Sequence, residues 1–254
     1  MHATKRKLGI AYEQQNNFKM NLIEVMTYLE SKGSEQIRKI FMNHGAPENI
    51  FGVKVGDMKP IQKIEKTNHA LAIELFDTCN SDAQYLAGLI ADPKLFSKAD
   101  FEKWLITAEW HMITDYAVAW NLAESPLCME ICSEWIQSSE EKRQECAWAA
   151  MSAYLGIVPD EKIDKVYHKS LIEQVEKKIH SAPNRVRYGM NNYIIALGGA
   201  VPEFTDRCKK AGDTIGIVEV FMGATSCKVP DIRTYIEKME EKNRIGKKKK
   251  TAKC

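Results

Sequence analysis

Hydrophobic residues recur every three to four positions along most of this chain. That spacing puts them on one face of an α-helix, whereas the alternation typical of β-strands is nearly absent. Gly, Pro and Asp/Ser residues interrupt the pattern and mark where helices begin and end. Only residues 214–223, TIGIVEVFMG, alternate as an extended segment does. The pattern predicts helices over residues 21–33, 34–45, 55–66, 69–79, 81–92, 98–109, 113–125, 126–139, 140–156, 160–180, 184–199, 202–212 and 229–243.

Short links join these predicted helices in pairs, which is typical of a helix bundle or of a stacked helical array. Neighbouring pairs share their spacing but not their sequence, as the units of an irregular HEAT-like solenoid do. We therefore expect an all-α, HEAT-like helical-repeat solenoid, an alpha-alpha superhelix, with a long concave face suited to an extended partner. The predicted organisation is an N-terminal extension (1–17), the repeat domain (18–243) and a basic tail (244–254).

The composition excludes several classes of protein. No apolar run reaches the roughly 18 residues that cross a bilayer, so we expect no membrane span. The first residues lack the apolar region of a signal peptide, which favours the cytoplasm. Seven cysteines occur without a CxxC pair, and Cys128 and Cys132, four apart, have no nearby histidine. We expect free thiols in a reducing compartment, no metal site and no cofactor.

The net charge of +2 conceals an asymmetry between the tail and the rest of the chain. After Glu241 the chain carries seven basic residues and no acidic one; subtracting these seven leaves the rest at −5. A flexible polybasic tail is typical of an arm that binds nucleic acid. A solvated tail that keeps the protein in solution explains the composition equally well. The basic residues are Lys242, Arg244, Lys247, Lys248, Lys249, Lys250 and Lys253.

The segment 109–120, EWHMITDYAVAW, places the carboxylate of Asp115 within an apolar and aromatic helical run. His111 lies four residues earlier and shares a helix face with Asp115. A carboxylate among aromatic rings is poorly hydrated, which is costly without a partner or a cationic ligand. Two interpretations follow: Asp115 is a structural residue satisfied by a helix cap or a neighbouring helix, or it belongs to a site that receives positive charge.

Three segments together resemble a known family. They are FGVKVGDMKPIQK (51–63), the Trp110–Asp115 segment, and residues 219–254, which begin EVFMGATSCKVPDIRTYIEK. From about residue 20 onward the chain is similar to the DNA alkylation repair family, the AlkD-like DNA glycosylases built from HEAT-like repeats. The family motif has a tryptophan four residues before an aspartate. Here Asp115 matches the aspartate, His111 stands at the tryptophan position, and the tryptophan is Trp110.

The resemblance implies a basic concave cradle that binds duplex DNA, and excision of cationic N3- and N7-alkylpurines. Nothing in the sequence demands more than a monomer. Such a base is already a good leaving group, so the chemistry needs a fixed carboxylate that stabilises the oxocarbenium-like sugar. Asp115 would supply it, and Trp110 would offer a ring face to the cation. His111 would clamp Asp115 or, when protonated, contact a phosphate. Core packing explains Trp110 equally well.

Phosphate contacts need cations and helix N-termini along one face. Lys59 and Lys63 share a face of their predicted helix, and Arg185 and Arg187 open another; each is equally explained as a solvated surface charge. The resemblance also implies an arginine that contacts the DNA backbone, near residues 141–155, where Arg143 and Trp148 are the candidates. It also adds a second tryptophan position within 187–198, where this chain has Asn192 or Tyr193. The predicted DNA-binding set is Lys54, Lys59, Lys63, Trp148, Arg185, Arg187, Asn192, Lys247 and Lys248.

Three functions therefore stay open from the sequence. The first is a DNA glycosylase that acts on alkylated bases through Asp115. The second is a solenoid that binds DNA or RNA in the same cradle without cleavage, which the altered tryptophan positions favour. The third is a scaffold for other proteins, which the acidic body favours. The charge of the concave face distinguishes these functions, because a negative face would exclude both nucleic-acid functions and leave the scaffold.

Overall fold

A computed structural model describes residues 19–253 of this chain; the predicted extension 1–17 lies outside them. The described residues form α-helices joined by short links and contain no strand. The α-helices are α2 (Leu22–Lys32), α3 (Glu35–Asn43), α4 (Val55–Glu65), α5 (His69–Asp77), α6 (Ser81–Ile90), α7 (Lys98–Thr107), α8 (Ala119–Glu124), α9 (Cys128–Trp135), α10 (Glu141–Leu155), α11 (Lys165–Lys178), α12 (Asn184–Ala200), α13 (Thr205–Ile215) and α14 (Ile232–Glu241).

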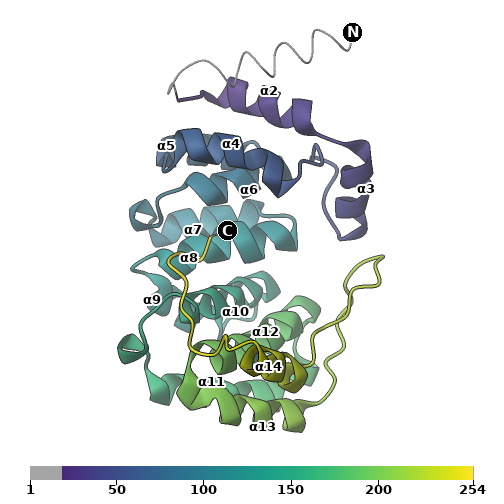
Figure 1. The fold of residues 1–254 in the computed structure, drawn as a ribbon. Coiled ribbons are helices and arrows are strands. Elements are labelled where there is room, and N and C mark those ends of the chain that lie inside the picture. The colour runs from purple at the N-terminus through teal and green to yellow at the C-terminus, as the bar shows by residue number, and fades with distance from the viewer. Residues whose placement is uncertain (1–18, 254) are drawn as a thin grey trace.

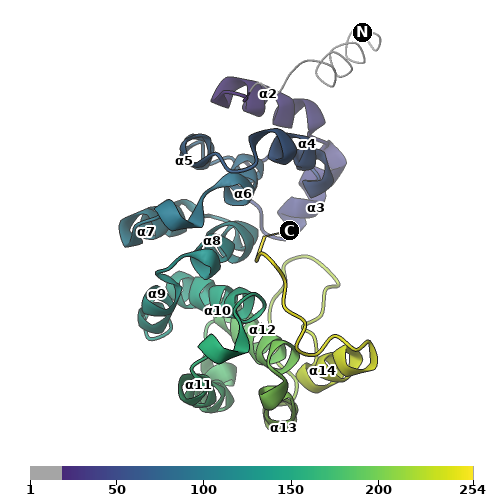
Figure 2. The ribbon, with the colours of Figure 1, turned by 60° about the vertical axis from the view of Figure 1, so that its left-hand side comes forward.

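The helices stack in sequence order from α2 to α13, as Figure 1 shows. Turned by 60°, the stack curves: α5, α7, α9 and α11 form an outer row, and α6, α8, α10 and α12 form an inner row (Figure 2). Within the inner row, α10 packs against both α8 and α12. The prediction of an all-α solenoid is confirmed. The segment 214–223 is not a strand, because α13 continues to Ile215 and an irregular loop covers residues 216–231.

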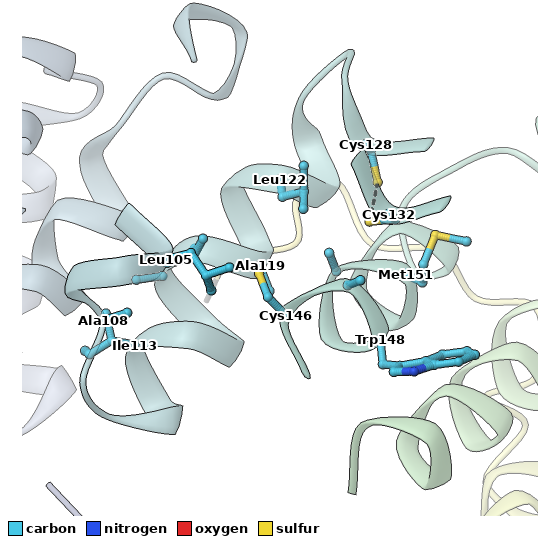
Figure 3. Packing of buried hydrophobic residues seen from close by; sticks show 14 of the residues in the cluster. Leu105, Ala108, Ile113, Ala119, Leu122, Cys128, Cys132, Cys146, Trp148 and Met151 are labelled. Atoms are coloured by element: carbon cyan, nitrogen blue, oxygen red, sulfur yellow. Dashed lines mark hydrogen bonds between the residues drawn. The ribbon is translucent and has the colours of Figure 1, made fainter. Parts of the chain in front are cut away.

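One hydrophobic core runs through the stack. At its centre α10 contributes Cys146, Trp148 and Met151, which pack beside residues of α8 and α9 (Figure 3). The Trp148 ring lies 5.0 Å from the ring of Tyr193 on α12. Such contacts between successive inner helices remove large aromatic surfaces from water, which is the main stabilisation available to a solenoid. The sulfurs of Cys128 and Cys132 lie 4.0 Å apart in this core as free thiols.

The helix ends follow the local signals in the sequence. Asn21 and Glu24 form a capping box at the start of α2, and Ser97 and Asp100 form one at the start of α7. In the first turn of α6, Asp82 accepts hydrogen bonds from the backbone N–H groups of residues 51–53. Three charge-assisted bonds offset the cost of burying this carboxylate. They also fasten the loop that leads into α4.

A single turn of π-helix, Ile113–Val118, precedes α8 and carries Asp115. A π turn widens the helix by one residue and leaves a carbonyl without its usual partner. The amide of Asn121 donates to the carbonyl of Ala117 at 2.8 Å and to that of Gly88 on α6 at 2.9 Å. Gly88 lets the two backbones meet, since a Cβ there would lie 2.6 Å from the Cα of Ala117. This close approach sets the position of the Asp115 segment in the stack.

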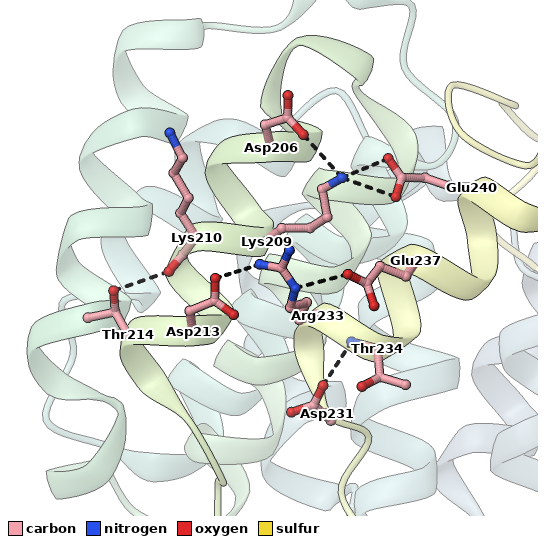
Figure 4. Close-up of polar contacts among 10 residues, drawn as sticks. All are labelled: Asp206, Lys209, Lys210, Asp213, Thr214, Asp231, Arg233, Thr234, Glu237 and Glu240. Carbon is pink, nitrogen blue, oxygen red and sulfur yellow. Dashed lines mark hydrogen bonds and ion pairs between the residues drawn. The ribbon is translucent and has the colours of Figure 1, made fainter.

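The last helix, α14, is fastened to α13 by ion pairs (Figure 4). Lys209 contacts Glu240 at 2.9 Å and Asp206 at 3.1 Å. Arg233 bridges Asp213 at 2.5 Å and Glu237 at 2.9 Å. Lys209–Glu240 and Arg233–Asp213 join the two helices, and such pairs are individually weak but contribute more as a network.

The basic tail packs against the body and runs back along the stack from α14 towards α8 (Figures 1 and 2). The Gly246 N–H donates to the carbonyl of Gly199 at 2.8 Å, and the Lys249 N–H donates to that of Gly156 at 2.8 Å. Farther along, the Ala252 N–H donates to the carboxylate of Glu124 at 2.6 Å. The ammonium of Lys253 reaches the carbonyl of Ala91 at 2.7 Å. The tail through Lys253 is therefore ordered on the inner helices rather than a free arm.

No helix among residues 19–253 combines the length and the hydropathy needed to cross a bilayer.

The close contact at Gly88 predicts that a Gly→Ala substitution there destabilises the protein, although such a substitution in a helix usually stabilises. Replacing glycine by alanine inside a helix normally stabilises by about 0.5–1 kcal/mol. Gly88→Ala is expected to lower the melting temperature instead, because its Cβ meets the backbone of Ala117. Gly56→Ala in α4 is the matched control, since a Cβ there meets nothing within 4 Å. Thermal unfolding by circular dichroism measures both; equal melting temperatures for the two variants would contradict the close approach.

Candidate functional site

Asp115 belongs to a charged cluster assembled from three elements of the inner row. The Arg185 Nη2 donates to Asp115 Oδ2 at 2.9 Å, and the Arg185 Nε donates to Glu145 Oε1 at 3.0 Å. Asp115 comes from the π turn, Glu145 from α10 and Arg185 from the first turn of α12. The side chains are only 11%, 8% and 15% exposed, respectively. One guanidinium thus bridges two buried carboxylates.

The packing of α12 on α10 brings Arg185 to this position. Gly189 makes the packing close, because a Cβ there would lie 2.9 Å from the Cβ of Trp148. The backbone N–H of Arg185 donates to Glu141 Oε1 at 3.0 Å, which caps the start of α12 from α10. The guanidinium also lies over the ring of Tyr188 at 4.7 Å. Backbone, ring and carboxylates together fix the arginine in one place.

The cluster holds one cation for two carboxyl groups. Burial raises the pKa of Asp115 well above its usual range, and the charge of Glu145 raises it further, while Arg185 opposes both effects. Burial likewise raises the pKa of Glu145, again opposed by Arg185. With both carboxylates ionised the cluster would carry a net negative charge away from water. It therefore favours uptake of a proton at the carboxyl pair.

His111 and Trp110 lie beside the cluster without pairing with Asp115. Burial, together with the positive charges of Arg185 and His44, lowers the pKa of His111 to about 3, so its ring is neutral at physiological pH. The Nε1 of Trp110 donates to the carbonyl of His44 at 2.9 Å, and its ring packs 5.3 Å from Phe41. Trp110 is 5% exposed, so core packing accounts for it.

The loop 216–231 lies against the same end of α12. The side chain of Asn184 accepts from the Phe221 N–H at 2.8 Å and donates to the Phe221 carbonyl at 2.9 Å. Arg185 Nη1 lies 4.0 Å from the sulfur of Met222. At its tip the loop reaches the end of α3, where the Ala224 N–H donates to the carbonyl of Asn43. The loop thereby joins the first and last parts of the stack beside the charged cluster.

The predicted DNA-binding residues fall into two groups. Lys54, Lys59 and Lys63 are exposed around α4, and Lys247 is exposed on the tail. The side chains of the second group are partly buried, or are paired with other residues of the fold. Arg187 is half-buried, and Asn192 is partly exposed on α12.

Three predicted side chains are buried or paired within the fold in this structure. Trp148 is fully buried in the core. Arg185 is held by the two carboxylates, and the ammonium of Lys248 is held by the carbonyl of Leu155 at 2.9 Å and by Asp160 at 2.8 Å. Trp148 would have to leave the core to reach DNA, and the two cations would have to leave their partners in the fold to reach a phosphate. Arg143, the other candidate on α10, is paired with Glu102 at 3.0 Å.

The sequence left open whether Asp115 is a structural residue or receives an external cation. The structure satisfies it from a neighbouring helix, through an arginine 70 residues away. Glu145 is not among the residues predicted from the sequence, because its residue type alone does not mark one glutamate of a charged helix start as buried. Its spacing does carry a signal, since Glu141 and Glu145 lie four apart on one face of α10, the face that meets α12. Within residues 19–253 no group of His, Cys, Asp and Glu side chains is arranged to hold a metal ion.

Removing the bridging guanidinium is expected to destabilise the fold strongly. Arg185→Met leaves two buried carboxylates without their cation, which costs roughly 3–5 kcal/mol in comparable pairs. Arg244→Met, at an exposed arginine, is the matched control and is expected to change stability by less than about 0.5 kcal/mol. Urea unfolding gives both values. A loss at Arg185 no larger than at Arg244 would show that the cluster is not held by charge.

The neutral His111 predicts a loss of stability in acid. Its pKa is about 3 in the fold against 6.5 in the unfolded chain. Between these pH values the unfolded state binds a proton that the folded state does not, so stability falls as the pH falls below 6.5. His111→Gln is expected to reduce the difference in unfolding free energy between pH 7 and pH 5, by less than about 1.4 kcal/mol per pH unit. An unchanged difference would contradict a buried neutral ring.

Comparisons with known proteins show what this chain is similar to. A sequence model described as DNA alkylation repair enzyme matches residues 25–207. The chain is 32% identical to the protein Lin0241 of Listeria innocua over 226 residues, covering 87% of this chain and 96% of the relative. It is 30% identical to the protein Lmo0209 of Listeria monocytogenes over 224 residues, covering 86% and 96%.

A solved structure superimposes with a TM-score of 0.86 at 34% identity and covers 92% of this chain and 100% of its own. It is described as representing a new family of proteins related to the HEAT-like repeat DNA glycosylases with affinity for branched DNA structures. The HEAT-like character of the solenoid is thereby confirmed, together with the resemblance found in the sequence. The chain belongs to the DNA alkylation repair family, with the HEAT-like repeat fold of the AlkD-like proteins.

Proposed function

We propose that this protein binds branched DNA on the curved face of its solenoid and does not excise alkylated bases. Support for DNA binding comes from the family and from the similar solved protein, whose described affinity is for branched DNA. Exposed lysines along α4 and on the tail supply cations for phosphates. Binding of this kind needs no chemistry at Asp115.

The observation that carries the non-catalytic part is the bridge from Arg185 to Asp115 at 2.9 Å. A glycosylase carboxylate stabilises positive charge that develops on the sugar as a cationic base departs. Here a guanidinium is already paired with the carboxylate, and a fixed positive charge beside it repels both the cationic base and the oxocarbenium-like sugar. Burial and the charge of Glu145 also raise the pKa of Asp115, which disfavours the negative charge that the chemistry requires.

The surroundings of Asp115 support the same conclusion. Cation–π recognition of an alkylpurine needs an open ring face within about 6 Å of the cation. Trp110 is packed against Phe41 and held by the carbonyl of His44, and Tyr193, in the later predicted position, is fully buried. Burial, together with the charge of Asp115, raises the pKa of Tyr116 to about 12, so this phenol supplies no proton acceptor at neutral pH.

Binding is tested with an immobile four-way DNA junction and a linear duplex made of the same sequences. The protein is titrated into each by gel shift at several salt concentrations. We expect tighter binding to the junction, with an affinity that falls steeply as salt rises because phosphates release counterions. Equal affinity for the two DNAs would overturn the preference for branches. No binding to either would favour the scaffold for other proteins.

Catalysis is tested separately by the release of methylated purines from duplex DNA treated with a methylating agent. We expect no release by the wild type above the spontaneous rate. The control is Asp115→Asn, which keeps the shape of the side chain but removes its charge. Release by the wild type that is lost in Asp115→Asn, with DNA binding retained, would reinstate the glycosylase and its carboxylate.

A further inference from the structure

We propose that the C-terminal tail is a fixed phosphate-binding strip, in which Lys247, Lys249 and Lys250 contact DNA while Lys248 and Lys253 anchor the strip to the body. The inference rests on the proposed DNA binding and assigns one surface to it. The tail contacts the C-terminal ends of four inner helices in turn. These are α12 at Gly199, α10 at Leu155 and Gly156, α8 at Glu124 and α6 at Ala91.

Four helix C-termini at one edge create a negative surface. Each end exposes unsatisfied carbonyls and carries a partial charge of about −0.5. Glu124 adds a full negative charge at the end of α8, and Asp160 lies close to the end of α10. Bare, this edge of the inner row would repel a phosphate backbone. The tail covers it with backbone N–H groups and ammonium groups, and so reverses the sign of the charge that a ligand meets.

The lysines of the tail divide into two kinds. Lys248 and Lys253 point at the body: Lys248 binds the carbonyl of Leu155 and the carboxylate of Asp160, and Lys253 binds the carbonyl of Ala91. Burial of the Lys253 ammonium lowers its pKa to about 8. Lys247, Lys249 and Lys250 are exposed, and none of them forms an ion pair within residues 19–253. Three cations are thus left free to meet an external anion.

The exposed lysines stand on a backbone that is already fixed. The Lys249 N–H is bonded to the carbonyl of Gly156, and the Lys247 N–H to that of Arg244. A DNA strand that binds here therefore does not have to order the tail, which lowers the entropic cost of association compared with a free arm. Lysine ammonium groups recognise phosphates as point charges and read no base sequence. The strip therefore fits a ligand recognised by the course of its backbone, as branched DNA would be.

The test replaces the three exposed lysines together, as Lys247→Gln, Lys249→Gln and Lys250→Gln. The control replaces three exposed lysines of the outer helix α11, as Lys169→Gln, Lys177→Gln and Lys178→Gln, so that both proteins lose the same charge. Binding to the four-way junction is measured against salt. The tail variant is expected to bind more weakly, with a slope of log affinity against log salt that is shallower by about 2–3. The α11 variant is expected to keep the wild-type slope.

Three outcomes are distinguishable. If the wild type does not bind the junction, the proposed function itself fails. If the wild type binds and the tail variant retains its full salt slope, DNA binding stands and the strip is overturned. If the tail and α11 variants lose equal affinity, the effect is one of net charge alone and the strip is overturned as well.

Hydrogen exchange separates phosphate contact from release of the tail. The amide of Lys249 is expected to exchange equally slowly in the wild type and in the exposed-lysine variant, because its bond to Gly156 is untouched. Lys248→Gln combined with Lys253→Gln is expected to speed this exchange at least tenfold, since both anchors are lost. Fast exchange in the exposed-lysine variant would mean that its weaker binding reflects a detached tail, and would overturn the assignment.

Discussion

The guanidinium of Arg185 holds together the part of the stack on which the site depends. It joins the π turn, α10 and α12 through Asp115 and Glu145, and the loop 216–231 lies against it. Two carboxylates can be buried there only because a cation and a hydrogen-bond network are buried with them. In the proposed function, the same bridge is the reason why Asp115 does not support base excision. A single contact, Arg185 to Asp115, therefore both stabilises the buried carboxylate and, in the proposed function, explains the absence of base excision.

Close backbone packing makes this contact possible. Gly88 lets α6 approach the π turn, and Gly189 lets α12 approach α10. The side-chain amide of Asn121 donates to the carbonyls of Ala117 and Gly88 and so links α8 to α6. A HEAT-like solenoid has only neighbouring helices to stabilise each layer, so small residues and buried amides at these crossings determine where each side chain points. Within one fold, such crossings decide whether an aspartate faces a ligand or a neighbouring helix.

The tail neutralises the negative charge that the solenoid gathers at the C-terminal ends of its inner helices. Inner helices that run in the same direction collect their C-terminal ends along one edge, and the partial charges there add up. In this chain the basic tail is folded onto that edge instead of extending into solvent. The acidic body and the basic tail, separate in the sequence, form one continuous surface in the fold. Net charge alone would not reveal it, because the two contributions nearly cancel.

The sequence by itself determined the helices, their order and the family. The predicted ranges 34–45 and 184–199 correspond closely to α3 and α12, because helical hydrogen bonds and caps join residues only a few positions apart. Only the tertiary structure decided that Asp115 is paired with Arg185, that Trp110 and Trp148 are buried, and that the tail is anchored. Those facts depend on contacts between residues up to 162 positions apart, and local spacing carries no information on which distant charge will share a buried position.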